Sequence, residues 1–257
     1  MKNLSLKTSF FLIFILFSSK IFSQESRFSK EKFISSSGDT LNYRMLYPDA
    51  DTIRKYPLVI FLHGSGERGN DNESQLKWGV TNFAKDEMMR LYPSFVIAPQ
   101  CPLNFNWSNF TKPYNDLDMK LDPTPSKPMA SLISLIKNLT VKFNIDTNRI
   151  YITGLSMGGF GTFDAIERYP NLFAAAVPVC GGGDLTKVPL IAHIPIWIFH
   201  GSEDFVVNTK DALEMTNALF KAGAHPGLTL LPEVGHFSWI TAYEDRTMLQ
   251  WLYRQHK

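Results

Sequence analysis

Six short runs of almost unbroken apolar residues restrict the fold of this chain more than any other feature. We predict strands at YPLVIFLHG, SFVIAPQ, RIYITG, FAAAVPVCG, PIWIFHG and GLTLLPE, which are residues 56–64, 94–100, 149–154, 173–181, 195–201 and 227–233. Apolar residues recur at helical spacing between and after these runs, which predicts helices over 74–88, 126–143, 157–169, 209–223 and 242–255. Strands that are apolar on both faces must be covered on both faces. The pattern therefore predicts an α/β fold with a mostly parallel central sheet.

The segment 34–48 differs from these runs because its polar and apolar residues alternate. It is split by Gly38-Asp39, a typical turn sequence. We expect it to form an antiparallel hairpin at the edge of the sheet.

Four glycines surround one serine in GLSMGGFGTF, residues 154–163, where a predicted strand becomes a predicted helix. A dinucleotide-binding loop would need G-x-G-x-x-G, and the run from Gly159 fails at its last position. A phosphate-binding P-loop would need a lysine after the glycines, and none is present there. The segment Gly154-Leu155-Ser156-Met157-Gly158 does match G-x-S-x-G, the nucleophile elbow of serine hydrolases. A glycine-rich turn without a chemical role is the alternative.

An elbow serine needs a histidine base and an acid that orients it, in the chain order Ser, Asp or Glu, His. Asp204 follows the predicted strand 195–201, and His236 follows the strand 227–233. Glu203 is a competitor for the acid, but neighbours on a loop point apart, which favours Asp204. We expect His200, at a strand end, to have a structural role.

With these positions filled, the chain resembles the α/β-hydrolase serine esterases over nearly all of residues 24–257. The segments GLSMGGFGT, HGSEDFVV and PEVGHFSW are similar to secreted esterases of the polyhydroxybutyrate-depolymerase and feruloyl-esterase type, and to a neighbouring group of predicted peptidases. The resemblance implies Ser156, Asp204 and His236 as a catalytic triad. Dienelactone hydrolases share the fold but carry a cysteine at the elbow, so the resemblance does not imply lactone chemistry.

Acyl transfer also needs donors for the oxyanion that develops on the substrate. The backbone N–H of Met157, directly after the serine, is one candidate. The resemblance places the second in the loop after strand 56–64, at Ser65, with Gly64 as the alternative because the HGGG form of this loop is absent. We expect His63 and Arg68 to support the loop.

The segment between Cys180 and Pro195 is too short to hold the cap domain that is usually inserted there in this fold, so we expect an open site without a cap. The long loop 101–125 follows a strand end and carries Phe105, Trp107, Phe110 and Tyr114. These rings either form an aromatic wall for a substrate or hold the loop on the domain. Trp107 is the substrate-binding candidate among them, and Trp239, three residues after His236, is a second one.

The first 23 residues have the pattern of a secretory signal peptide: lysines, an apolar run from Phe10 to Phe17, then small residues up to Ser23. An uncleaved anchor is the alternative. Cleavage after Ser23 would leave 24–257 as one catalytic domain. Cleavage would remove Lys2, Lys7 and Lys20, so the remaining chain would have 23 of the 26 basic residues and all 24 acidic ones. This balance indicates neither a nucleic-acid partner nor a membrane partner. We expect the two cysteines, Cys101 and Cys180, to be buried thiols rather than a disulfide.

The sequence thus predicts an exported serine hydrolase that cleaves carboxylic esters with short or aromatic acyl groups, such as those carried on a polysaccharide or polyester. We expect it to need no cofactor or metal. A serine peptidase of the same fold and a non-catalytic carbohydrate-binding relative are the two alternatives.

Overall fold

The computed structural model describes residues 24–49, 53–111 and 119–257, so the predicted signal peptide lies outside the described residues. Within them, eight strands form one sheet in the order β1-β2-β4-β3-β5-β6-β7-β8. The strands are β1 (Ser29–Ile34), β2 (Thr40–Leu46), β3 (Tyr56–Leu62), β4 (Phe95–Pro99), β5 (Ile145–Leu155), β6 (Ala175–Val179), β7 (Trp197–Gly201) and β8 (Gly227–Leu231). All six predicted core strands are present.

The helices follow the strands along the chain. The α-helices are α1 (Asp86–Leu91), α2 (Lys127–Lys142), α3 (Met157–Arg168), α4 (Val188–Ile191), α5 (Thr209–Lys221), α6 (Trp239–Glu244) and α7 (Arg246–Arg254). Short 3₁₀ turns are η1 (Gln24–Arg27), η2 (Ser65–Glu67), η3 (Ser74–Leu76), η4 (Val80–Ala84) and η5 (Leu185–Lys187).

Strand pairing agrees with the predicted mostly parallel sheet. The strands β4, β3, β5, β6, β7 and β8 pair in parallel, and each residue of β3 is buried, as its unbroken apolar sequence requires. The predicted antiparallel edge hairpin forms between β1 and β2, with Ile34 opposite Thr40. Its first strand was placed wrongly, because β1 spans Ser29–Ile34 and lies almost entirely before the predicted segment 34–48. Because β2 also pairs antiparallel with β4, the hairpin extends the parallel sheet.

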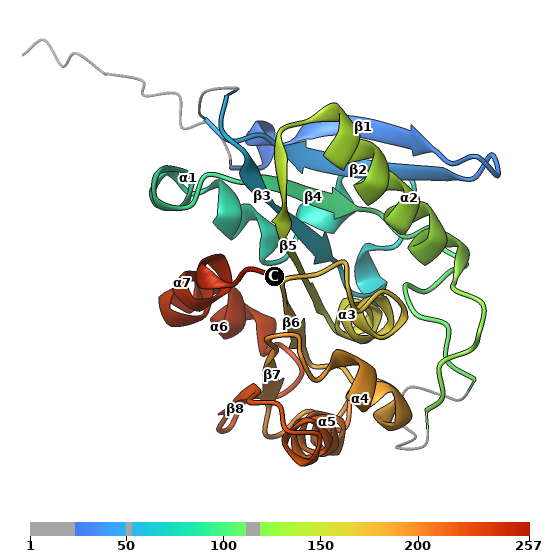
Figure 1. Cartoon of the computed structure of the whole chain (residues 1–257), viewed down its shortest axis with the longest axis vertical. Coiled ribbons are helices and arrows are strands. Elements are labelled where there is room, and N and C mark those ends of the chain that lie inside the picture. Colours follow the sequence, from blue (N-terminus) through green and yellow to red (C-terminus); the bar gives the residue numbers. More distant parts are fainter. Residues whose placement is uncertain (1–23, 50–52, 112–118) are drawn as a thin grey trace, which may run out of the picture.

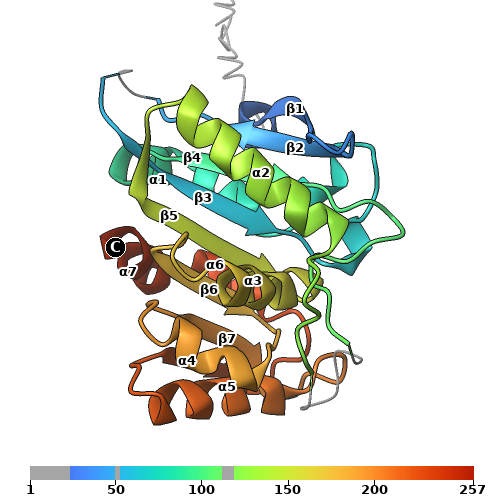
Figure 2. The same ribbon diagram turned by 45° about the vertical axis from the view of Figure 1, so that its right-hand side comes forward.

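Helices cover both faces of this twisted sheet (Figures 1 and 2). On one face, α2, α3, α4 and α5 pack an apolar layer that includes Leu132, Phe163 and Met215. On the other, η4, α1, α6 and α7 pack a second layer that includes Phe83, Tyr243 and Leu252. The sheet is therefore buried between two apolar layers, as the α/β prediction required.

The prediction of a single amphipathic helix over 74–88 is wrong. Gly79 interrupts it with φ +72°, in the left-handed region that side chains avoid, and a Cβ there would lie 2.3 Å from the Tyr243 ring. The chain forms η3, η4 and α1 instead, and Asn82 of η4 donates to the backbone carbonyl of Tyr243 in α6. Similarly, the predicted last helix is two helices, because Asp245 caps α7 through the amides of Thr247 and Met248.

The predicted lack of a cap agrees with the structure. Every residue between β6 and β7 is described, and this segment contains only the short elements η5 and α4. Among the described residues, no helix combines the length and apolar character that a membrane span needs.

Candidate active site

Ser156 lies in the sharp turn between β5 and α3, with φ 53° and ψ −117°. For a residue other than glycine, this conformation costs on the order of 1–3 kcal/mol. The nearby glycines permit the turn: a Cβ on Gly158 would lie 2.0 Å from the carbonyl oxygen of Leu62, and one on Gly154 would lie 2.4 Å from that of Gly158. The strand and helix can approach this closely only because both positions lack side chains.

The structure brings Ser156, His236 and Asp204 into one chain of hydrogen bonds. The three residues follow β5, β8 and β7, whose carboxyl ends lie on the same edge of the sheet. Nε2 of His236 is 2.9 Å from Ser156 Oγ, and Nδ1 of His236 is 2.8 Å from Oδ2 of Asp204. Since a carboxylate only accepts, Nδ1 carries a proton, which leaves Nε2 of the neutral ring free to accept from the serine hydroxyl.

The Asp204 carboxylate is held on both oxygens. Oδ1 accepts from the backbone amides of Val206 and Val207, each at 2.9 Å. Burial alone would raise the pKa of Asp204, but hydrogen bonds from His200, His236 and these amides outweigh it and hold the pKa well below its ordinary value. Asp204 is therefore ionised at neutral pH. The competing acid, Glu203, is exposed to solvent.

The loop after β3 is fixed by the two residues predicted to support it. Nδ1 of His63 donates to the Gly64 carbonyl at 2.6 Å, and Nε2 accepts from the amide of Cys101 at 2.9 Å. Burial lowers the pKa of His63 to about 4, so the ring is neutral. Arg68 donates to Sδ of Met157 at 3.2 Å and to the side chain of Asn106. This arginine thus joins the loop that carries Ser65 to the first residue of α3.

A cavity of about 270 Å³ opens beside Ser156 and His236. Its lining includes the predicted oxyanion loop, represented by Gly64 and Ser65. Three aromatic side chains also line it: Trp78, Phe237 and Trp239. Their ring centroids lie 5.9 Å (Trp78–Phe237), 6.1 Å (Trp78–Trp239) and 4.9 Å (Phe237–Trp239) apart.

Trp239 is 5% exposed, and its ring meets His236 edge to face at 5.1 Å. The predicted substrate-binding candidate thus lies in the cavity wall, mostly buried. Sequence reasoning missed Trp78, together with Lys77 and Glu67, which also line the cavity. The sequence pattern assigns Trp78 and Lys77 to a helix that does not form.

The second substrate-binding candidate, Trp107, is corrected by the structure. Its side chain is 0% exposed, and Nε1 donates to the carbonyl oxygen of His63 at 3.1 Å. A Cβ on Gly161 of α3 would lie 2.4 Å from Trp107 Cβ, so the ring is packed against that helix. Trp107 therefore holds the long loop on the domain and has no surface for a substrate. Phe110 packs on Phe160 of α3 at 6.4 Å, and Tyr114 lies outside the described residues.

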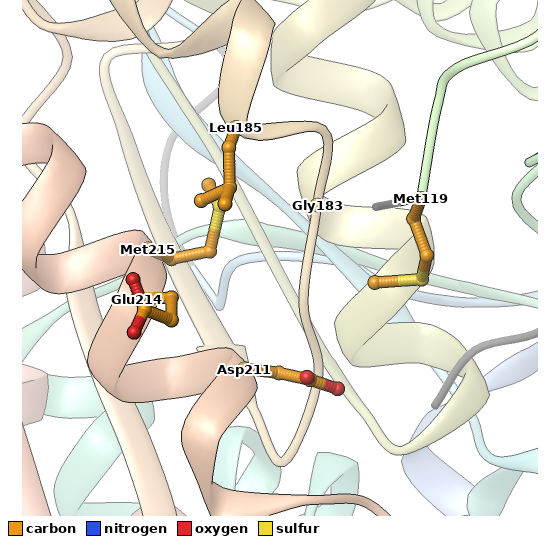
Figure 3. Close-up of a pocket in the computed structure, with 6 residues that line it drawn as sticks. All are labelled: Met119, Gly183, Leu185, Asp211, Glu214 and Met215. Carbon is orange, nitrogen blue, oxygen red and sulfur yellow. The ribbon is translucent and has the colours of Figure 1, made fainter. Parts of the chain in front are cut away.

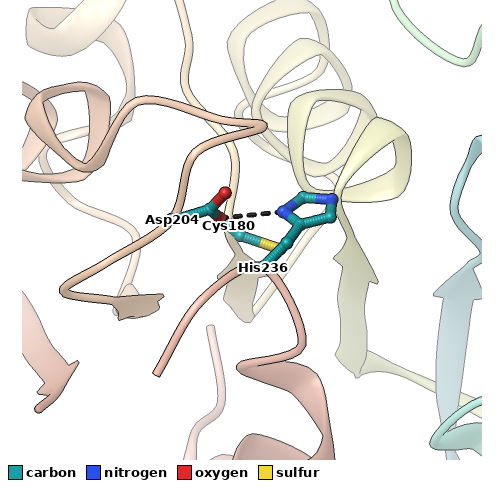
Figure 4. A group of neighbouring side chains, drawn as sticks. All are labelled: Cys180, Asp204 and His236. Carbon is teal, nitrogen blue, oxygen red and sulfur yellow. Dashed lines mark hydrogen bonds and ion pairs between the residues drawn. The ribbon is translucent and has the colours of Figure 1, made fainter. Parts of the chain in front are cut away.

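Cys180 approaches the histidine and the aspartate from β6 (Figure 4). Its sulfur, a nitrogen of His236 and a carboxylate oxygen of Asp204 lie within 4.8 Å of one another. Burial raises the pKa of Cys180 to about 12, so the thiol is neutral at neutral pH and is not an activated nucleophile. Cys101 and Cys180 are both free and buried, as predicted.

Comparisons with known proteins identify the family of the chain. The sequence model of the phospholipase/carboxylesterase family matches residues 50–250. The chain is 40% identical to a thermostable esterase of known structure, with a TM-score of 0.83, over 90% of this chain and 64% of that one.

Two curated proteins are also similar. The bifunctional acetylxylan esterase/xylanase XynS20E of Neocallimastix patriciarum is 26% identical over 164 residues, which are 63% of this chain and 21% of that protein. Poly(3-hydroxyalkanoate) depolymerase C of Paucimonas lemoignei is 28% identical over 126 residues, 49% of this chain and 28% of that protein. This chain spans less than two thirds of the length of each of the three proteins. The family match, the sheet order and the esterase neighbour together show that the chain belongs to the phospholipase/carboxylesterase family and has an α/β-hydrolase-type fold.

Proposed function

We propose that this chain is an exported serine esterase that cleaves esters with short or aromatic acyl groups through an acyl-enzyme on Ser156. The observation that carries the proposal is the continuous hydrogen bonding from Ser156 Oγ through His236 to Asp204, beside a cavity with an aromatic wall. Nucleophile, base and orienting acid thus meet within hydrogen-bonding distance, as acyl transfer requires.

In the first half of the reaction, Ser156 Oγ attacks the ester carbonyl carbon while Nε2 of His236 takes the hydroxyl proton. The imidazolium that forms is stabilised by the Asp204 carboxylate, which stays ionised. The tetrahedral intermediate then collapses: the bond to the alcohol oxygen breaks, and His236 gives its proton to that oxygen. The products of this half are the free alcohol and acylated Ser156.

In the second half, water takes the place of the alcohol. His236 removes a proton from the water, whose oxygen attacks the acyl carbon, and returns that proton to Ser156 Oγ as the acid leaves. The backbone amides of Met157 and Ser65 hold the oxyanion in both halves. Met157 is the first residue of α3, where a helical N–H has no partner within the helix.

The size and wall of the cavity support a compact acyl group. At about 270 Å³, the cavity lies just below the range of roughly 300–1,000 Å³ that is common for drug-sized ligands. Rings beside polar groups such as Lys77 suit an aromatic acyl group or a sugar. Since the segment between β6 and β7 carries no cap, an ester attached to a polymer chain could reach Ser156. Export rests on the leader pattern in residues 1–23, and the reaction as proposed uses only this chain and water.

The test is labelling with a fluorophosphonate probe, followed by parallel assays of an aryl ester and an aminoacyl anilide. Wild type should be labelled and should hydrolyse the ester. Ser156→Ala should lose the label and lower kcat by about 10⁴–10⁶-fold with unchanged circular dichroism. Absence of labelling would support a non-catalytic relative, and preferential cleavage of the anilide would support a peptidase. Either result would overturn the proposal.

A further inference from the structure

Arg68 links the two segments that carry the proposed oxyanion donors. It directly follows η2, whose first residue is Ser65, and its guanidinium reaches the first residue of α3. Nε of Arg68 donates to Sδ of Met157 at 3.2 Å, and Nη2 donates to Oδ1 of Asn106 in the loop 101–125. Both hydrogen bonds are made between side chains, so they leave the backbone amides of Ser65 and Met157 uninvolved.

The loop is also fixed on the other side of Ser65. A Cβ on Gly64 would lie 2.8 Å from Cδ1 of Leu155, the residue before the nucleophile, so Gly64 packs directly against the end of β5. Ser65 itself is exposed. The chain around Ser65 is thus attached to the β5–α3 turn at two points, through the packing of Gly64 before it and the hydrogen bond of Arg68 after it.

Asn106 supplies the stronger of the two bonds to Arg68, because a thioether sulfur is a weak acceptor. Its neighbour Trp107 is buried against α3, which fixes this part of the long loop on the domain. The backbone amide of Gly69, next to Arg68, donates to the carbonyl oxygen of Cys101 at 3.0 Å. Both ends of the bond between Arg68 and Asn106 therefore lie on segments that are attached to the domain.

We propose that Arg68 is a positioning residue that holds the backbone amides of Ser65 and Met157 at the spacing that one oxyanion needs. The inference rests on the proposed function. Both amides must lie about 2.7–3.1 Å from the same substrate oxygen, although they belong to different elements. A displacement of about 1 Å in such a site can lower the rate about 100-fold. Arg68 acts through the loop and through Met157, and it takes no part in bond making.

Replacing Arg68 with glutamine should lower kcat for 4-nitrophenyl acetate about 10–100-fold and change KM by less than about 2-fold. Glutamine is too short to bridge Met157 and Asn106, whereas the rings that line the cavity are unchanged. Arg68→Lys keeps the positive charge but lacks the planar fork of donors, so it should be impaired almost as much. Recovery of wild-type kcat by lysine would mean that the charge acts rather than the position, and would overturn the inference.

A comparison of two backgrounds separates positioning from a general effect on the fold. Proline at position 65 has no N–H, so in Ser65→Pro there is no donor at that point to hold in place. Arg68→Gln should therefore cost less than about 3-fold in kcat in the Ser65→Pro background. Met157→Leu keeps the backbone N–H but removes the acceptor sulfur, so it should lower kcat in wild type and add little in Ser65→Pro. It gives the same comparison if Arg68→Gln does not fold. Equal losses in the two backgrounds would overturn the inference.

Met215→Leu is the matched control for Met157→Leu. Met215 is 1% exposed and Met157 is 3% exposed, so both are buried methionines. Met215 lies on α5 and lines a cavity of about 10 Å³ together with Leu185 and Met119 (Figure 3). Its replacement should leave kcat unchanged. The control thus separates loss of the sulfur that Arg68 contacts from the effect of repacking a buried methionine.

An aryl trifluoromethyl ketone tests the oxyanion hole without turnover. Ser156 Oγ bonds to the carbonyl carbon of this inhibitor and gives its proton to His236, and the carbonyl oxygen becomes an oxyanion like that of the transition state. In Arg68→Gln, the inhibition constant should rise by about the factor by which kcat/KM falls, with unchanged circular dichroism. An unchanged inhibition constant, or a rise in KM alone, would overturn the inference. Absence of fluorophosphonate labelling in wild type would instead overturn the proposed function, and the inference with it.

Discussion

Trp78 and Trp239 meet edge to face, with 6.1 Å between ring centroids and 61° between ring planes, in the wall of the cavity beside Ser156. One residue precedes η4 and the other begins α6, so the wall joins distant parts of the chain. Trp78 is half-buried, whereas Trp239 is buried. Trp78 therefore has exposed surface that a bound acyl group can contact, and replacing it removes less buried surface from the fold than replacing Trp239 would.

Replacing Trp78 with alanine should raise KM for 4-nitrophenyl benzoate about 3–10-fold more than KM for 4-nitrophenyl acetate. The two esters share a leaving group, so the difference isolates contact with the acyl ring, worth about 0.5–1.5 kcal/mol. Trp78→Phe keeps an aromatic wall and is the matched control. Equal changes for both esters would place the acyl group elsewhere.

Ser65→Pro should lower kcat by about 10²–10³-fold, the effect of removing one oxyanion donor. Proline removes the N–H, and position 65 is the first residue of η2 after an extended Gly64 with φ −77° and ψ 178°, where proline fits. Ser65→Ala keeps the N–H and should retain near wild-type kcat. If the proline variant is as active as the alanine variant, with both folded by circular dichroism, the second donor is Gly64.

Asp204→Asn should lower kcat by several orders of magnitude, whereas Glu203→Gln should stay near wild type. Asparagine cannot stabilise the His236 cation and favours the wrong tautomer of the ring. Glu203 is exposed, whereas the carboxylate that is hydrogen-bonded to Nδ1 of His236 is that of Asp204. Steady-state kinetics on one aryl ester compares the two variants, and the reverse ranking would move the acid to Glu203.

Glu167→Gln should become more stable than wild type as the pH rises. Glu167 is buried in α3, where its Oε1 accepts from the Asp184 amide at 2.9 Å and its Oε2 has no partner among the described residues. Its pKa is raised in the folded state, so the unfolded chain, with a pKa of about 4.3, loses the proton first. Between that pH and the folded pKa, wild type loses up to about 1.4 kcal/mol of unfolding free energy per pH unit.

Glutamine mimics the protonated acid and has no proton to lose. Urea denaturation at pH 5, 6, 7 and 8 should therefore show the two stability curves diverging, with the variant higher at pH 8. The exposed Glu214→Gln serves as the control and should run parallel to wild type. A constant offset between Glu167→Gln and wild type would mean that Glu167 is ionised in the folded protein.

The six core strands and the helices α2, α3 and α5 could be predicted because their buried faces require apolar residues at a regular spacing along the chain. Leu132 and Leu139 of α2, for example, recur on one face of a regular helix and are both buried. The helix over 74–88 failed because Gly79 packs against Tyr243, a contact between distant segments that no local pattern contains.

The elbow and the positions of Asp204 and His236 could be predicted from the sequence, because each residue follows the end of a predicted parallel strand. The carboxyl ends of parallel strands lie on the same edge of a sheet, so residues at these ends are brought together. The assignment of aromatic residues could not. Trp107 and Trp78 have the same side chain, and only tertiary packing decides that the first is buried against α3 and that the second lines the cavity.

The order of strands in the sheet has a consequence for how the enzyme is made. Ser156, Asp204 and His236 follow β5, β7 and β8, and β8 is the last described strand of the chain and the outermost one in the sheet. A chain that has been synthesised only as far as β7 contains Ser156 but lacks His236, because His236 follows β8. The hydrogen bonds from Ser156 through His236 to Asp204 can therefore form only after β8 has paired with β7.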